Sequence, residues 1–281
     1  MMKSLVHLLA GGWNMAVDPK KPRKVLVVHG VQTGSDAALD QDRAIDELIR
    51  SRLGNIPFSF DCELYRYEDL NDAAQKKFKL LNQLLVENPV GRAVSGKVID
   101  IVGDVVISLS DNSTARQIRQ GLKEKILAIY NSGNPCYIVA HSLGSIYAFD
   151  VVNELIADHL YFDRSSRKTW PVQGLLTIGS PIGLDMFKVT GRDKIRNLGA
   201  GNKWLRWLNI WDHNDPVVSG NIFGTFLSDY KIAEDFLTSD PAQGWVIRDI
   251  AADTGKVWLM AHTAYWNSPV VGDKLVDMVT S

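Results

Sequence analysis

The chain has 281 residues, of which 46% are hydrophobic and 22% are charged. A globular protein has this composition, whereas a disordered chain, a collagen or a coiled coil does not. The 31 basic and 32 acidic residues leave a net charge of −1. Because a nucleic-acid-binding protein needs an excess of basic residues to neutralise phosphates, we expect no nucleic-acid partner.

The cysteines and the apolar segments indicate where the protein acts. Cys62 and Cys136 cannot form a disulfide framework, and we expect two buried thiols in a reducing compartment. No segment approaches the roughly 20 apolar residues of a transmembrane helix. Polar residues and glycines interrupt the apolar residues 1–17, so we expect no export signal. The sequence predicts a cytoplasmic protein without a transmembrane segment, with an N-terminal arm at residues 1–24.

Apolar runs that suit buried strands alternate with segments whose apolar residues recur at helical spacing. The first run, Val25 to Val28, is unbroken, as expected for a strand buried on both faces. In chain order, the predicted strands are 25–28, 58–67, 136–140, 172–178, 207–211 and 245–250. The predicted helices are 45–53, 71–86, 114–130, 145–159 and 270–279. Strands joined by such helices form βαβ units, so we predict an α/β fold with a mostly parallel, doubly wound sheet.

Two details of this pattern concern its boundaries. Ser35 and Asp36 are candidate caps for the helix at 45–53. Residues 68–113 interrupt the alternation, and their second apolar stripe, at 98–109, fits a helix or a strand. We expect this segment to be a helical insertion or cap on a single domain that spans residues 1–281.

A serine follows the third predicted strand in a sharp-turn motif. The residues Ala140-His141-Ser142-Leu143-Gly144 join this strand directly to a helix. Small residues two positions on either side of the serine let the chain pass close to itself and expose the hydroxyl at the carboxyl edge of the sheet. Alanine stands where this motif usually has its first glycine. We interpret Ser142 as a nucleophile supported by His141 and Gly144, with an ordinary helix start as the alternative.

An acid and a base follow the serine in the chain order that is typical of this kind of turn. A serine hydroxyl needs a histidine as base, and a carboxylate orients that histidine. His213 and His262 are the histidines beyond the serine's own helix, and His262 lies in the predicted loop before the closing helix. Asp212 and Asp215 both follow the fifth strand. We favour Asp215, since the following proline forces an extended backbone on it, and Asp212 suits a turn cap.

Two backbone N–H groups are candidates for the oxyanion hole that acyl transfer requires. One belongs to Leu143, directly after the serine, and the other to Val31, in the loop after the first strand. In that loop Gly30 permits unusual backbone dihedral angles. We expect His29 to have a structural role and to form hydrogen bonds within the loop.

Taken together, these motifs resemble the α/β-hydrolase superfamily in its lipase and serine-esterase branch. The resemblance covers about residues 25–280 and rests on five motifs: Val27-Val28-His29-Gly30, the turn at Ser142, Thr177-Ile178-Gly179-Ser180-Pro181, Asn214-Asp215-Pro216-Val217, and His262. It implies an eight-stranded, mostly parallel sheet, ester hydrolysis, and no metal or organic cofactor.

The residues and the resemblance lead to one functional expectation and its rivals. We expect a serine hydrolase that cleaves carboxylic esters of small molecules or lipids through an acyl-enzyme intermediate. A thioesterase or peptidase would use the same Ser142, Asp215 and His262. A non-catalytic binding or scaffold protein is the rival from another class, although such proteins usually lack one of the three residues. Basic residues are scattered over 164–168 and 192–196. We interpret them as a solvated surface, with attraction to an anionic lipid or substrate, and so peripheral membrane contact, as the alternative.

Overall fold

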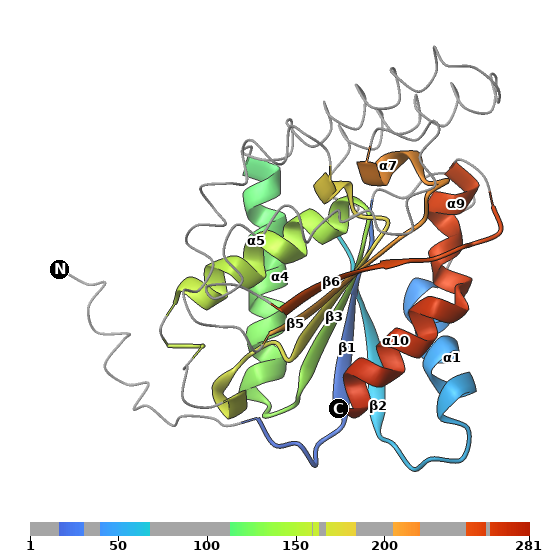
Figure 1. Ribbon diagram of the computed structural model, residues 1–281. Coiled ribbons are helices and arrows are strands. Elements are labelled where there is room, and N and C mark those ends of the chain that lie inside the picture. Colours follow the sequence, from blue (N-terminus) through green and yellow to red (C-terminus); the bar gives the residue numbers. More distant parts are fainter. Residues whose placement is uncertain are drawn as a thin grey trace.

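Six parallel strands form one sheet, and helices cover both of its faces (Figure 1). The computed structural model describes residues 17–30, 40–67, 113–158, 160–162, 167–183, 205–219, 246–256 and 259–281. The strands are β1 (Arg23–Val28), β2 (Phe60–Tyr65), β3 (Cys136–His141), β4 (Gly174–Ile178), β5 (Arg206–Trp211) and β6 (Val246–Ala251). They lie in the order β2-β1-β3-β4-β5-β6, and every neighbouring pair is parallel. The predicted α/β fold with a doubly wound sheet is confirmed. The described residues contribute six strands, where the resemblance implied eight.

Four long helices form the outer layers. Helices α1 (Gln41–Leu53) and α10 (Pro269–Thr280) cover one face, and α4 (Ser113–Asn131) and α5 (Leu143–Ala157) cover the other (Figure 1). The shorter helices are η3 (Arg167–Thr169), η4 (Pro181–Gly183), α7 (Pro216–Ser219), α9 (Leu259–Ala264) and η5 (Tyr265–Asn267). In the described ranges, no helix is both long enough and apolar enough to cross a membrane.

The central strands are apolar throughout because both of their faces are buried. Val25 and Val27 of β1 pack in the cluster with α1 and α10, whereas Leu26 and Val28 pack in the cluster with α4 and α5. All four side chains are fully buried. Successive residues of a strand point to opposite faces, so an unbroken apolar run fills both layers of the core.

Three predicted boundaries need correction. Helix α1 begins at Gln41 with Asp40 in the N-cap position; the predicted caps, Ser35 and Asp36, lie outside the described residues. Residues 23 and 24 belong to β1 and not to an arm, because they pair with β2. Ser113 begins α4 and is not part of an insertion. The remainder of the predicted insertion, 68–112, and residues 1–16 of the arm also lie outside the described residues.

The strand order reverses its direction between β1 and β3. From β1 the chain moves to β2 at the edge, and then returns past β1 to β3 and onward to β6. In open α/β sheets, ligands bind where the direction reverses in this way, outside the carboxyl ends of the strands. The residues that follow β1 and β3 at this position are His29-Gly30 and Ser142.

Candidate active site

Ser142 occupies a strained turn between β3 and α5. Its backbone has φ 52° and ψ −130°, and in the described part of the chain it alone among non-glycine residues has a positive φ. Such a conformation costs an L-residue on the order of 1–3 kcal/mol. The Ser142 N–H donates to the Ile178 carbonyl (3.0 Å), and the Ser142 carbonyl accepts from the Ser145 N–H (3.0 Å). These bonds hold the strained turn in place at the sheet edge.

Two glycines provide the space that this turn needs. A Cβ atom on Gly144 would collide with the carbonyl oxygens of Val28 (2.6 Å) and His29 at the end of β1. A Cβ atom on Gly30 would lie 2.6 Å from the Ser142 Cβ. Gly30 does not use the left-handed freedom of a glycine, because its φ is not in that region. The lack of a side chain is what allows the two segments to approach so closely.

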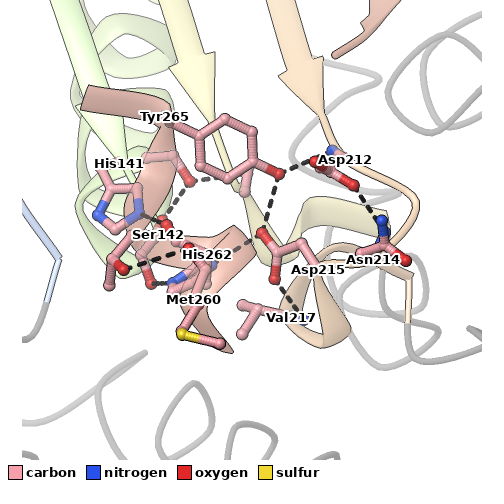
Figure 2. A network of polar contacts seen from close by, with 12 residues as sticks. His141, Ser142, Asp212, Asn214, Asp215, Val217, Met260, His262 and Tyr265 are labelled. Atoms are coloured by element: carbon pink, nitrogen blue, oxygen red, sulfur yellow. Dashed lines mark hydrogen bonds and ion pairs between the residues drawn. The ribbon is translucent and has the colours of Figure 1, made fainter. Parts of the chain in front are cut away.

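Ser142, His262 and Asp215 form a continuous row of hydrogen bonds (Figure 2). The Ser142 hydroxyl donates to the His262 Nε2 at 2.9 Å. The His262 Nδ1–H donates to the Asp215 Oδ2 at 2.8 Å. All three residues are buried, with exposed fractions of 2%, 4% and 0%. His262 lies on the short helix α9, which corrects the prediction that a loop carries it.

Three donors fix the carboxylate of Asp215. Its Oδ1 accepts from the Val217 N–H (2.9 Å), and its Oδ2 accepts from the Tyr265 hydroxyl (2.9 Å) in addition to His262. A buried carboxylate needs such partners, because burial without them costs several kcal/mol. The carboxylate is therefore held in one orientation, facing the imidazole.

Asp212, the other candidate acid, has different partners. Its Oδ1 accepts from the Asn214 N–H (2.7 Å), and its Oδ2 accepts from the Thr254 N–H (2.7 Å). It therefore closes the turn after β5 and ties that turn to the segment after β6. The side chain of His213, the other candidate base, is 45% exposed and lies 3.5 Å from the Asp212 Oδ1.

His141 supports the helix segment that carries His262. The His141 Nε2–H donates to the His262 carbonyl at 2.7 Å, and the two ring centroids are 4.6 Å apart. The edge of the ring also contacts Trp266 (5.0 Å between centroids). Burial, and after it the neighbouring His262, lowers the pKa of His141 well below its ordinary value. His141 is therefore neutral and adds no positive charge beside His262.

The remaining predicted site residues lie around the carboxyl end of β1 and the start of α5. The His29 Nδ1 lies 2.5 Å from the Gly30 carbonyl oxygen, its ring stacks on Tyr67 (4.6 Å), and the Tyr67 hydroxyl donates to the His29 carbonyl at 2.5 Å. Leu143 is the first residue of α5, where a helix leaves its N–H groups without an intrahelical acceptor. Val31 lies outside the described residues.

Several residues without a predicted role also contact this row of hydrogen bonds. The Ser145 hydroxyl lies 2.5 Å from the Ser142 carbonyl oxygen and 2.7 Å from the Ser180 hydroxyl, and so supports the turn. Gly179 (φ 55°) lies against Tyr265 and the acid–base pair. The position of Gly179 directly after a buried strand was the sequence feature that could have identified it as a site residue. Tyr265 lies three residues after His262, one helical turn away, but a packed aromatic residue has the same pattern.

Gly179→Ala is expected to destabilise the fold more than a matched glycine substitution. The new Cβ would lie 2.8 Å from the Tyr265 Cε2 and 3.1 Å from both the Asp215 Oδ2 and the His262 Nδ1. Gly54→Ala is the control, because Gly54 has a similar φ of 54° and open space around the added atom. Each variant carries backbone strain of about 1–3 kcal/mol, and Gly179→Ala adds about 1–3 kcal/mol of overpacking. Urea unfolding of both variants measures the difference, and equal losses would show that the site tolerates the extra atom.

Acid is expected to destabilise the protein through His141. The folded protein keeps this side chain neutral, because its pKa is lowered, whereas the unfolded chain protonates it below about pH 6.5. Unfolding then takes up a proton, so the stabilising effect is complete above about pH 6.5 and is lost as pH falls. Relative to His141→Gln, the wild type should lose up to about 1.4 kcal/mol per pH unit in this range. Urea unfolding between pH 5 and 8 checks this, and parallel curves for the two proteins would contradict it.

In the described ranges, no group of three or more histidine, cysteine or acidic side chains could hold a metal ion.

A scan against protein-family models and a search of curated proteins find no match. Among solved structures, SOBER1 of Arabidopsis thaliana aligns over 92% of this chain and 98% of its own, with a TM-score of 0.43 and 12% identity. The N-formylmaleamic acid deformylase Nfo of Pseudomonas putida aligns over 94% of each chain (TM-score 0.38, 8% identity). Phospholipase PlaB of Legionella pneumophila aligns over 68% of this chain and 38% of its own (TM-score 0.34, 10% identity).

Proposed function

The parallel sheet with a strained serine turn after β3 is an α/β-hydrolase-like fold, and on this premise we propose that the protein is a serine hydrolase. It cleaves carboxylic esters of small molecules or lipids through an acyl-enzyme intermediate. The observation that carries this proposal is the buried row of hydrogen bonds from Ser142 through His262 to Asp215. A nucleophile, a base and an orienting acid in hydrogen-bond contact are the recognised geometry of nucleophilic acyl transfer.

In the first step, Ser142 attacks the ester carbonyl while His262 removes the hydroxyl proton. Asp215 holds the imidazole with Nδ1 protonated, so that the lone pair on Nε2 faces the Ser142 hydroxyl. The imidazolium then returns this proton to the leaving alcohol, and the acyl group remains on Ser142. In the second step, His262 activates a water in the same way, and hydrolysis releases the acid and restores the serine.

The negative charge on the tetrahedral intermediate needs donors at the start of α5. The Leu143 N–H is the first donor, since the turn places it next to the nucleophile at a helix N-terminus. The partial positive charge of that helix end adds to the effect. We assign the second donor to the N–H of Val31, because Val31 follows Gly30 in the sequence and Gly30 lies against Ser142.

Two features favour an enzyme over a binding or scaffold protein. The conformation of Ser142 is strained. Backbone strain of this kind persists only where the surrounding contacts enforce it, and it is concentrated at active sites. The Asp215 carboxylate is also aimed at an imidazole whose other nitrogen contacts the serine. A scaffold protein would need neither arrangement. A thioester or an amide would use the same residues, so substrate tests must separate these classes.

Labelling with a fluorophosphonate probe tests the proposal directly. We expect the purified wild-type protein to react at Ser142, identified by peptide mass, and to hydrolyse some members of a panel of p-nitrophenyl esters and phospholipids. Thioesters and peptide amides of matched acyl groups are measured alongside the esters. Absence of both labelling and turnover would contradict a serine hydrolase, and faster turnover of thioesters or amides would contradict the ester assignment.

A further inference from the structure

We propose that Tyr265 is a positioning residue that acts through Asp215, and that its hydroxyl fixes the carboxylate in the orientation that serves His262. The inference rests on the proposed function, since it concerns the acid of the same site. The structural basis is a fully buried hydroxyl that joins the acid turn after β5 to the helix segment that carries the base.

Both hydrogen bonds of the Tyr265 hydroxyl have a defined direction. The Asp212 N–H can only donate, and it lies 2.7 Å from the hydroxyl oxygen. The hydroxyl therefore accepts from Asp212 and gives its own hydrogen to the Asp215 Oδ2, at 2.9 Å. Figure 2 shows the tyrosine hydroxyl pointing toward the two aspartates, with a contact to each. One hydroxyl thus fixes the backbone at the start of the turn and the carboxylate at its end.

The base and the tyrosine reach the same carboxylate oxygen from one segment of chain. His262 on α9 and Tyr265 at the start of η5 are three residues apart, and both donate to the Asp215 Oδ2. The third donor, the Val217 N–H, holds Oδ1. Rotation of the carboxylate would break the tyrosine bond and the imidazole bond together. Loss of the hydroxyl would leave the imidazole as the single donor to Oδ2 among these three.

The protonation state of Tyr265 is consistent with a permanent donor. Burial, and after it the negative charge of Asp215, raises the pKa of Tyr265 well above its ordinary value. Among the described residues, Asp215 and Asp212 face the hydroxyl, His262 lies on the far side of the shared oxygen, and the His141 ring lies 6.3 Å from the tyrosine ring. The hydroxyl keeps its hydrogen over the pH range in which a histidine acts as a base.

Gly179 leaves the space that the Tyr265 ring occupies. Gly179, at the end of β4, has no side chain, and a Cβ there would lie 2.8 Å from the Tyr265 ring. Phenylalanine keeps the ring and removes only the oxygen. Tyr265→Phe therefore tests the hydroxyl with little change in packing.

The first test compares Tyr265→Phe with Tyr65→Phe. The Tyr65 hydroxyl also makes a hydrogen bond, at 2.8 Å, but its acceptor is the Ile118 carbonyl on α4. We expect Tyr265→Phe to lower kcat roughly 10- to 100-fold with little change in KM, because misplaced catalytic groups cost factors of this size. Tyr65→Phe should keep the wild-type kcat. Rates are expressed per site titrated with fluorophosphonate, so unfolded protein is not counted. A wild-type kcat in Tyr265→Phe, or an equal loss in Tyr65→Phe, would overturn the inference.

A double-mutant cycle tests whether the tyrosine acts through the acid. If it does, Tyr265→Phe should change the labelling rate at Ser142 by less than about twofold in an Asp215→Asn background, because residues of one network are not additive. Multiplied losses in the double variant would mean that the tyrosine acts independently, which overturns the inference. A wild-type protein without labelling or turnover would instead refute the proposed function, so the two failures are distinguishable.

Discussion

Ser142→Ala is expected to abolish ester turnover and fluorophosphonate labelling together. The hydroxyl is the atom that forms the acyl bond, and it alone occupies the strained turn against the imidazole. Only substrate binding and the oxyanion donors remain in the variant, which leave a rate on the order of 10³–10⁴ above that of water. His262→Ala should cause a similar loss, since residues that act as a unit fail together and not additively. Initial rates and labelling on the purified variants measure both effects.

The control for these variants is Ser132→Ala, which removes a serine hydroxyl at the end of α4. That hydroxyl bonds to the Ile129 carbonyl (2.6 Å), so its loss should leave turnover unchanged. Thermal unfolding of Ser142→Ala should show a folded protein, because the alanine keeps the backbone contacts of the turn. Near-normal hydrolysis by Ser142→Ala or His262→Ala would refute the proposed mechanism.

The layers of the fold were predictable because they depend on local patterns. An unbroken apolar run such as Val25 to Val28 identifies a strand buried on both faces, and β1 confirms it. The stripe of α4, with Ile118, Leu122 and Ile126 fully buried, shows the spacing of an amphipathic helix. Helix α9 escaped detection because its six residues are too few for periodicity to register. Its apolar residues could equally belong to a loop.

The candidate site was predictable only in part, because some of its contacts join segments far apart in the chain. The order Ser142, Asp215, His262 is typical of this kind of serine turn, and the structure brings these three into contact. The close approach of Gly30 to Ser142 had no local sequence signal, because it depends on how two strands lie side by side. The contact of Tyr265 with Asp215 spans 50 residues of sequence, and no local pattern reports it.

Asp215→Asn is expected to lower kcat by about 10⁴ while the protein stays folded. The amide of asparagine places an N–H₂ group either at the Oδ2 position, beside the His262 Nδ1 and the Tyr265 hydroxyl, or at the Oδ1 position, against the Val217 N–H. In the first orientation, Nδ1 must accept and the proton moves to Nε2. The imidazole then cannot take the hydrogen of Ser142. The defect lies in the tautomer and not in packing, since asparagine and aspartate have nearly the same shape.

Asp212→Asn is the matched comparison, because Asp212 is equally buried and lies on the same turn. In the part of the chain that the structure describes, its oxygens accept hydrogen bonds from the backbone N–H groups of Asn214 and Thr254, and an amide keeps one of these two bonds. The loss should be about 1–3 kcal/mol in the free energy of unfolding, with kcat within about tenfold of wild type, far less than the loss expected for Asp215→Asn. Steady-state kinetics and urea unfolding of the two variants separate a chemical defect from a structural one. The reverse order of damage, with Asp212→Asn the slower enzyme, would assign the acid to Asp212 and require a rearranged turn in the active protein.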